Sequence, residues 1–149
     1  MVTLQRTDSS NEDFRSLVAF LDAELRIRDG AEHTFYAQFN KIDLIQHVVV
    51  AYADGQAVGC GAFKPFADAT VEIKRMFVLS DFRGRHIAQA VLQELEAWAL
   101  EREANTFVLE TGLKQPEAIR LYERCGYTRI PNYGQYIGVE NSVCMQKVI

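Results

Sequence analysis

Hydrophobic and polar residues follow two different periods along the chain. Segments that alternate, or that are rich in β-branched residues, predict strands at Val2–Arg6, Ile45–Ala53, Ala57–Phe66, Thr70–Leu79, Thr106–Thr111, Tyr127–Ile130 and Ser142–Val148. Apolar residues at helical spacing predict helices from the candidate caps Ser9–Asn11 to Gly30, from His86 onward and from Pro116 to Gly126, with a shorter helix over Glu32–Phe39. The predicted order is β-α-α-β-β-β-α-β-α-β-β.

The middle of the chain, Thr70–Thr111, has the pattern strand, helix, strand. Two strands joined by one crossover helix are usually parallel, and ligands of such units lie beyond the carboxyl ends of the strands. Asp54-Gly55, between the two strands that precede this unit, favours a hairpin turn. The chain has 149 residues, of which 48% are hydrophobic, and this size fits one domain over residues 1–149.

Two expectations concern which side chains share a face. Strict alternation along Thr70–Leu79 places Val71, Ile73 and Phe77 on one face, and Glu72, Lys74, Met76 and Val78 on the other. In the helix that begins at His86, the apolar stripe leaves the solvent side to Gln89, Gln93, Glu96 and Glu103.

The composition narrows the classes of function. Because 20 Asp and Glu residues outnumber 16 Lys and Arg residues, the net charge of −4 argues against binding to nucleic acid or to an anionic membrane surface. Three cysteines without a CxxC pair favour reduced thiols, and no signal peptide or membrane span is visible, so a cytoplasmic location is expected. His33 and His47 lack acidic or cysteine partners at metal-ligand spacing, so no metal is expected.

The loop Ser80–Ala88 joins a strand directly to the start of a helix. Unpaired N–H groups and the helix dipole at such a position favour an anion, and Gly84 lets the backbone approach a phosphate closely. Arg83 and Arg85 add positive charge. The stretch therefore predicts a pyrophosphate site, with a tight turn that carries two solvated arginines as the alternative.

A second cluster follows the strand that ends at Thr111. Its helix opens with Pro116 and carries Tyr122 on one face with Ala118, Leu121 and Cys125. A phenol can donate a proton to a thiolate, and the carboxyl end of the neighbouring strand lies close in the predicted order. Tyr122 is a candidate acid, with a plain core tyrosine as the alternative.

Taken together, the two clusters resemble the GNAT (Gcn5-related) N-acetyltransferase superfamily. The family motif Arg/Gln-x-x-Gly-x-Gly/Ala corresponds to Arg83-Gly84-Arg85-His86-Ile87-Ala88, with His86 where the family usually has its first glycine. The family motif Asn-x-x-Ala-x-x-x-Tyr-Glu-x-x-Gly-Phe/Tyr corresponds to the segment from Gln115 to Tyr127, with Gln115 in place of Asn. The resemblance implies an α/β (α+β) fold: a mixed, mostly antiparallel central sheet with a splayed parallel strand pair, flanked by helices.

The resemblance also implies an acetyl-CoA site. Backbone groups of Met76, Phe77 and Val78 would bind the pantetheine arm as an added strand would. The pyrophosphate would lie against the N–H groups of Arg83, Gly84, Arg85, His86, Ile87 and Ala88, with Gln115 and Tyr122 completing the cofactor site. His86 keeps a usable N–H if it is helical, and we expect it to weaken cofactor binding rather than abolish it.

By the same resemblance, Tyr122 holds the position of the general acid that protonates the CoA thiolate. Glu72 is the candidate base, because it lies 11 residues before Arg83, as the base glutamate does in histone-type members. The alternatives are a salt bridge of Glu72 with Lys74 or Arg75, a base role for Glu110, and a chain of waters.

The acceptor pocket is expected between the helix region Glu24–Asn40, the strand with Glu72 and the Tyr- and Gly-containing loop Pro131–Asn141. A loop that crowds the acceptor groove favours a small primary amine as the substrate. The expected activity is direct acetyl transfer from acetyl-CoA to a small-molecule amine. Acetylation of a protein or peptide and non-catalytic acyl-CoA sensing are the alternatives, and a homodimer is common in the family.

Overall fold

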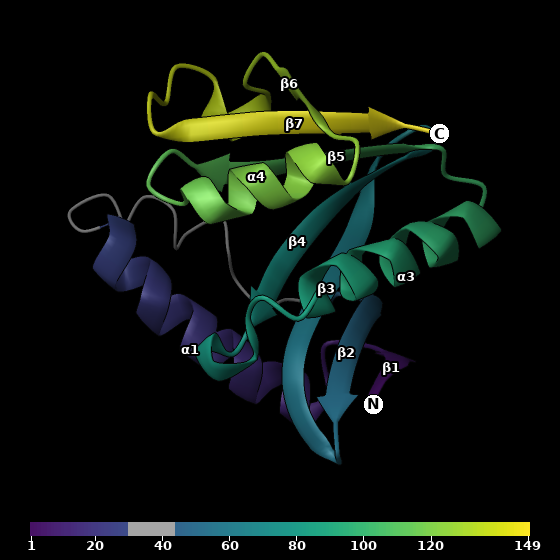
Figure 1. Ribbon diagram of the computed structural model, residues 1–149. Helices are drawn as coiled ribbons and strands as arrows, with labels where there is room; N and C mark the ends of the chain where they lie inside the picture. The colour runs from purple at the N-terminus through teal and green to yellow at the C-terminus, as the bar shows by residue number, and fades with distance from the viewer. Residues whose placement is uncertain (30–43) are drawn as a thin grey trace.

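The computed structural model describes residues 1–29 and 44–149 (Figure 1). The strands are β1 (Val2–Thr7), β2 (His47–Ala53), β3 (Gln56–Ala67), β4 (Thr70–Val78), β5 (Thr106–Gly112), β6 (Thr128–Ile130) and β7 (Ser142–Val148). The α-helices among the described residues are α1 (Glu12–Asp29), α3 (Ile87–Glu101) and α4 (Pro116–Arg124), and short 3₁₀ turns lie at Ser80–Phe82 and Gly134–Tyr136. The helix expected over Glu32–Phe39 lies outside the described residues.

The described residues contribute seven strands to one sheet, in the order β1-β2-β3-β4-β5-β7-β6. Within the described ranges, β4 and β5 are the parallel neighbours, and the other neighbouring pairs are antiparallel. The predicted fold class, a mixed and mostly antiparallel sheet flanked by helices, is confirmed.

Helices cover both faces of the sheet. α1 packs on one face through Phe14, Leu17, Val18 and Leu21, against apolar residues of β2, β3 and β4. α3 packs on the other face, and α4 adds Ile119 and Tyr122 to the same core. In Figure 1, α3 and α4 accordingly lie on one side of the sheet and α1 on the other.

The parallel pairing of β4 with β5 is short. It joins Thr70 to Thr106, Val71 to Phe107 and Glu72 to Val108, and no further pair follows. β4 then stays with β3 as far as Val78, while β5 stays with β7 as far as Gly112. The carboxyl ends of the two strands therefore separate, as Figure 1 shows, and the predicted splay is confirmed.

A β-bulge in β4 changes which side chains share a face. Cys60 pairs with Phe77 and Ala62 pairs with Lys74, so β4 has one residue more than β3 over this interval. Arg75, inside the interval, has φ +59°, in the left-handed region. Because an extra residue shifts the alternation by one, the faces predicted for this strand are wrong beyond Lys74. Phe77 joins the face of Glu72 and Lys74 that packs on α1, and Met76 and Val78 join the face of Val71 and Ile73.

The helices begin close to the predicted positions, and the structure shows which candidate residue caps the first helix. The first helix is capped by Asn11, whose Oδ1 accepts a hydrogen bond from the backbone N–H of Phe14 at 2.9 Å. The Ser9 hydroxyl instead accepts from the N–H of Ile45 at 3.1 Å and fastens the segment before β2. Pro116 opens α4, as predicted.

Glu96 of α3 is buried, although the helical pattern places it on the solvent side. The Tyr127 hydroxyl donates to its carboxylate at 2.7 Å, and Lys147 Nζ forms an ion pair with it at 3.0 Å. Both partners come from the C-terminal part of the chain, which covers this flank of the helix. A buried carboxylate needs such partners.

His47, at the start of β2, is buried among aromatic rings. Its ring stacks on Phe63 with the centroids 4.5 Å apart and meets the edge of Trp98 at 4.8 Å. Nδ1 of His47 has no hydrogen-bond partner within residues 1–29 and 44–149. Burial, followed by the charge of Arg102, lowers the pKa of His47 below its ordinary value.

This lowered pKa predicts a pH-dependent stability. Below the ordinary histidine pKa of about 6.5, the unfolded chain binds a proton at this position before the folded protein does, so the free energy of unfolding decreases as the pH falls. The His47→Phe variant keeps the stacking and lacks the titration. We expect it to lose less stability than the parent between about pH 7 and about pH 5 in urea denaturation. Parallel losses in the two proteins would contradict this account.

Candidate active site

A cleft of about 290 Å³ lies between β4, the start of α3 and the side of α4. It is lined by all of the predicted cofactor residues except Arg85: Met76, Phe77, Val78, Arg83, Gly84, His86, Ile87, Ala88, Gln115 and Tyr122. Arg85 is exposed, with its guanidinium 5.0 Å from the ring centroid of Phe82. Residues from three separate segments are thus brought to one cleft, and their contact with a cofactor stays a prediction.

The loop before α3 turns through two left-handed residues, Gly84 with φ +80° and His86 with φ +62°. His86 precedes the first residue of α3 and is not in the right-handed helical conformation that the sequence reading required for its N–H. A side chain costs energy in this conformation, whereas glycine adopts it freely. The family's preference for glycine at this position therefore has a direct backbone reason.

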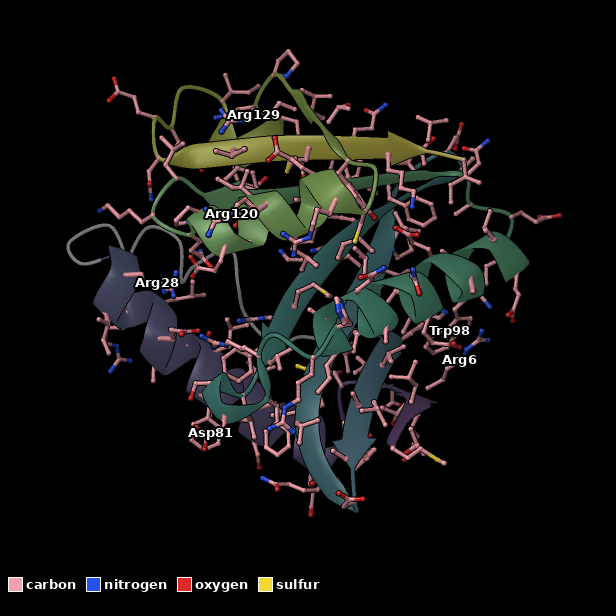
Figure 2. The ribbon with its side chains drawn as sticks, viewed as in Figure 1. Arg6, Arg28, Asp81, Trp98, Arg120 and Arg129 are labelled. Carbon is pink, nitrogen blue, oxygen red and sulfur yellow. The ribbon has the colours of Figure 1, made fainter. Side chains whose placement is uncertain are left out.

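Arg83 is held by its own neighbours. Its Nε donates to the carbonyl of Val78 at 2.9 Å, and its two terminal nitrogens each lie 3.0 Å from a carboxylate oxygen of Glu24 on α1. Arg28, one turn further along α1, pairs with both Glu24 and Glu117 of α4. Figure 2 shows Arg28 in this position between α1 and α4. A chain of charges therefore joins the loop, α1 and α4 along the cleft.

Tyr122 is buried on α4, with its ring edge-to-face on Tyr127 at 5.8 Å between centroids. Burial first, and then the charges of Cys125 and Glu110, raise the pKa of its phenol well above the ordinary value. The phenol is therefore protonated at neutral pH, as a proton donor must be.

A second cavity, of about 110 Å³, lies on the other side of Tyr122. It is lined by side chains of β4 and β5, by Leu21 and Leu25 of α1 and by Tyr136. The two cavities share Leu21, Met76, Gln115, Ala118 and Tyr122. Tyr122 thus stands where the two cavities meet.

Glu72 is buried in the wall of this second cavity. The Tyr133 hydroxyl donates to Glu72 Oε2 at 2.6 Å, and Lys74 Nζ lies 3.9 Å from Oε1. The second carboxylate of the cavity, Glu110, accepts from the Ser142 hydroxyl at 2.8 Å. The ion pair with Lys74 that the sequence offered as an alternative role for Glu72 is therefore present, while Arg75 pairs with Asp22 instead.

The loop at residues 131–141 reaches the site, as the sequence indicates. Tyr133 hydrogen-bonds to Glu72, and Tyr136 lines the cavity beside it. Sequence reasoning did not include Lys74 and Arg75 in the site. Lys74 lies two residues from Glu72 on the same strand, which is a signal that it shares a face with the predicted base. The bulge that brings Arg75 to the cavity has no such signal.

No group of three or more His, Cys, Asp or Glu side chains in the described parts of the chain has the arrangement of a metal site. None of the helices at residues 12–29, 87–101 and 116–124 is long and apolar enough to span a membrane.

Comparison with known proteins decides the family. A family model described as "Acetyltransferase (GNAT) family" matches residues 10–127. The chain belongs to the GNAT acetyltransferases. The matched range includes both motifs that were predicted to bind the cofactor. Residues of these two motifs line the cleft.

Individual GNAT relatives match at moderate identity. A protein of Azospirillum brasilense named IAA acetyltransferase is 34% identical over 100 residues, which are 66% of this chain and 65% of that protein. N-acetylaspartate synthetase of Danio rerio is 36% identical over 88 residues, 58% of this chain and 31% of that protein. The matches thus span less than two thirds of these curated relatives. A Klebsiella pneumoniae structure, provisionally named an acyl-CoA N-acyltransferase, is 30% identical with a TM-score of 0.84, covering 99% of this chain and 97% of that one.

The left-handed conformation of His86 in the loop before α3 can be tested through stability. The His86→Ala variant keeps the Cβ strain, whereas His86→Gly removes it. We expect the glycine variant to be more stable than the alanine variant by about 1 kcal/mol in denaturant unfolding. Equal stability of the two variants would show that His86 does not adopt this conformation in solution.

Proposed function

We propose that the protein is an acetyl-CoA-dependent N-acetyltransferase that transfers the acetyl group directly to a primary amine of a small molecule. The observation that carries the proposal is the position of Tyr122, a protonated phenol where a cofactor-like cleft meets a second, charged cavity. The names of the relatives, an acetyltransferase and a synthetase of N-acetylaspartate, support transfer to a small acceptor.

The residues of the cleft fit the parts of acetyl-CoA. Among residues 1–29 and 44–149, no strand pairs with β4 on its β5 side beyond Glu72, and this edge suits an extended amide-containing arm such as pantetheine. The N-terminus of α3 faces the same cleft and suits a pyrophosphate. A Cβ added to Gly84 would meet no heavy atom within 4 Å, so there is room for a phosphate at this turn.

The proposed chemistry joins the two cavities. The acceptor amine attacks the thioester carbonyl, so that a C–N bond forms and the C–S bond breaks. Tyr122 gives its proton to the departing thiolate, and Glu72 takes the proton released by the amine, directly or through water. Backbone N–H groups of β4 beyond Glu72 stabilise the charge that develops on the carbonyl oxygen.

The form of the second cavity favours a small acceptor over a protein chain. Its volume of about 110 Å³ lies below that of pockets for drug-sized ligands, about 300–1,000 Å³. Tyr136 in its wall and the hydrogen bond from Tyr133 to Glu72 hold the loop at residues 131–141 over the sheet at this point. A peptide needs an open groove here, so we infer a single small amine rather than a protein N-terminus or lysine.

The role of Tyr122 is tested with Tyr122→Phe, which keeps the ring packed on Tyr127. We expect kcat for thiol release in the presence of an accepted amine to fall about 100-fold, with unchanged binding of acetyl-CoA in calorimetry. Tyr52→Phe is the matched control, because its phenol bonds to Asp13 and lines neither cavity. Unchanged turnover in Tyr122→Phe would remove the acid role. Binding of acetyl-CoA without transfer to any amine would favour the acyl-CoA sensor.

The base is tested by comparing Glu72→Gln with Glu110→Gln. Both substitutions keep the size of the side chain and remove its ability to accept a proton. We expect kcat to fall about 100-fold in Glu72→Gln and far less in Glu110→Gln, measured in the same thiol-release assay. The opposite order would assign the base role to Glu110, and small losses in both variants would favour a chain of waters.

A further inference from the structure

Among the described residues, four that carry charged side chains line the second cavity, two acidic and two basic. Lys74 and Arg75 of β4 join Glu72 and Glu110 there, and the side chains of Lys74 and Arg75 are only 10% and 3% exposed. A cavity that receives an amine alone is served by acidic groups, because a buried cation beside an ammonium group weakens its binding. The two basic side chains therefore indicate a ligand that carries an anionic group in addition to its amine.

Arg75 presents an unused donor. Its Nη1 lies 2.9 Å from Asp22 Oδ1, but its buried Nε has no hydrogen-bond partner among the residues the structure describes. A buried guanidinium N–H without an acceptor is costly and rare. Arg75 is also in the left-handed conformation, and backbone strain of this kind clusters at functional sites. A ligand carboxylate is a strong acceptor for such a group and fits the guanidinium edge.

Lys74 adds a second cation to the same wall. Its Nζ is 3.9 Å from Glu72 Oε1, and its side chain is 10% exposed. Burial lowers the pKa of Lys74, and the charges of Glu72 and Glu110 oppose this shift without cancelling it. An anionic ligand group in the cavity favours the charged form of Lys74 and is attracted by it.

We propose that the acceptor is an amino carboxylic acid, held by its carboxylate at Arg75 and Lys74, with its amine between Glu72, Glu110 and Tyr122. The inference rests on the proposed function, because it assigns the acceptor of the same site. Arg75 is then a specificity residue: it binds the end of the substrate that does not react.

The test uses the whole chain, acetyl-CoA and sets of three acceptors that share one carbon skeleton. Each set contains an amino acid, its carboxamide and the amine that has a methyl group in place of the carboxyl group. Sets built on α-, β- and γ-amino acids cover different separations of the two charges. We expect kcat/KM for the acid to exceed that of both comparison compounds, which lack the carboxylate, by at least about tenfold, mainly through KM.

Variants of Arg75 and Lys74 test whether these residues cause the preference for the acid. In Arg75→Gln we expect the ratio of kcat/KM for acid over amine to fall about tenfold. Asp22→Asn is the matched control, since it removes the half-exposed partner of Arg75 and leaves the guanidinium in place, so the preference persists. Lys74→Met, expected to lower the same ratio, keeps the test decisive if Arg75→Gln does not fold.

The outcomes separate the two proposals. Equal kcat/KM for acid, carboxamide and amine in the parent protein overturns the amino-acid assignment and leaves the acetyltransferase function standing. A preference for the acid that persists in both Arg75→Gln and Lys74→Met overturns the assigned residues. Binding of acetyl-CoA without thiol release for any acceptor overturns the proposed function, and this inference with it.

Discussion

Between Lys74 and Phe77, β4 contains one residue more than β3 opposite it, and Arg75 takes up the extra length in a left-handed conformation. A bulge of this kind bends a strand and increases its twist. β4 remains paired with β3, and β5 remains paired with β7. The bend therefore separates β4 from β5, and their parallel ladder ends at Glu72. Both cavities lie beyond that point, so the site exists because the sheet comes apart there.

The opening between β4 and β5 has two sides that differ in the chemistry of their side chains. On the α3 side the cleft offers the open strand edge, a helix N-terminus and apolar side chains such as Phe82 and Ile87. On the α1 side, regular alternation places Glu72 and Lys74 on one face, and the bulge that follows brings Arg75 beside them. Tyr122 reaches both parts from α4. One backbone irregularity thus separates a region suited to a long, flexible cofactor from one suited to a small charged substrate.

Features that depend on a short stretch of sequence could be predicted. The strands and the described helices follow from periodicity, and the cleft residues could be predicted because two contiguous motifs supply most of them. Alternation failed in β4 beyond Lys74, since it assumes a regular ladder and Arg75 carries no mark of a bulge such as glycine. Glu96 was placed in solvent because its partners Tyr127 and Lys147 are distant in sequence. The pairing of Arg83 with Glu24, 59 residues apart, has no local signal either.

The pairing of Arg83 with Glu24 links the cleft to the second cavity through α1. Glu24 holds Arg83 of the cofactor loop, Arg28 ties the same turn of α1 to Glu117 of α4, and Leu21 and Leu25 of α1 form part of the second cavity. The phosphate that we propose at the start of α3 would compete with Glu24 for Arg83, because both are anions within reach of one guanidinium. A ligand that draws Arg83 from Glu24 would therefore act on α1, which lines the second cavity, while the ion pair of Arg28 with Glu117 holds α1 against α4.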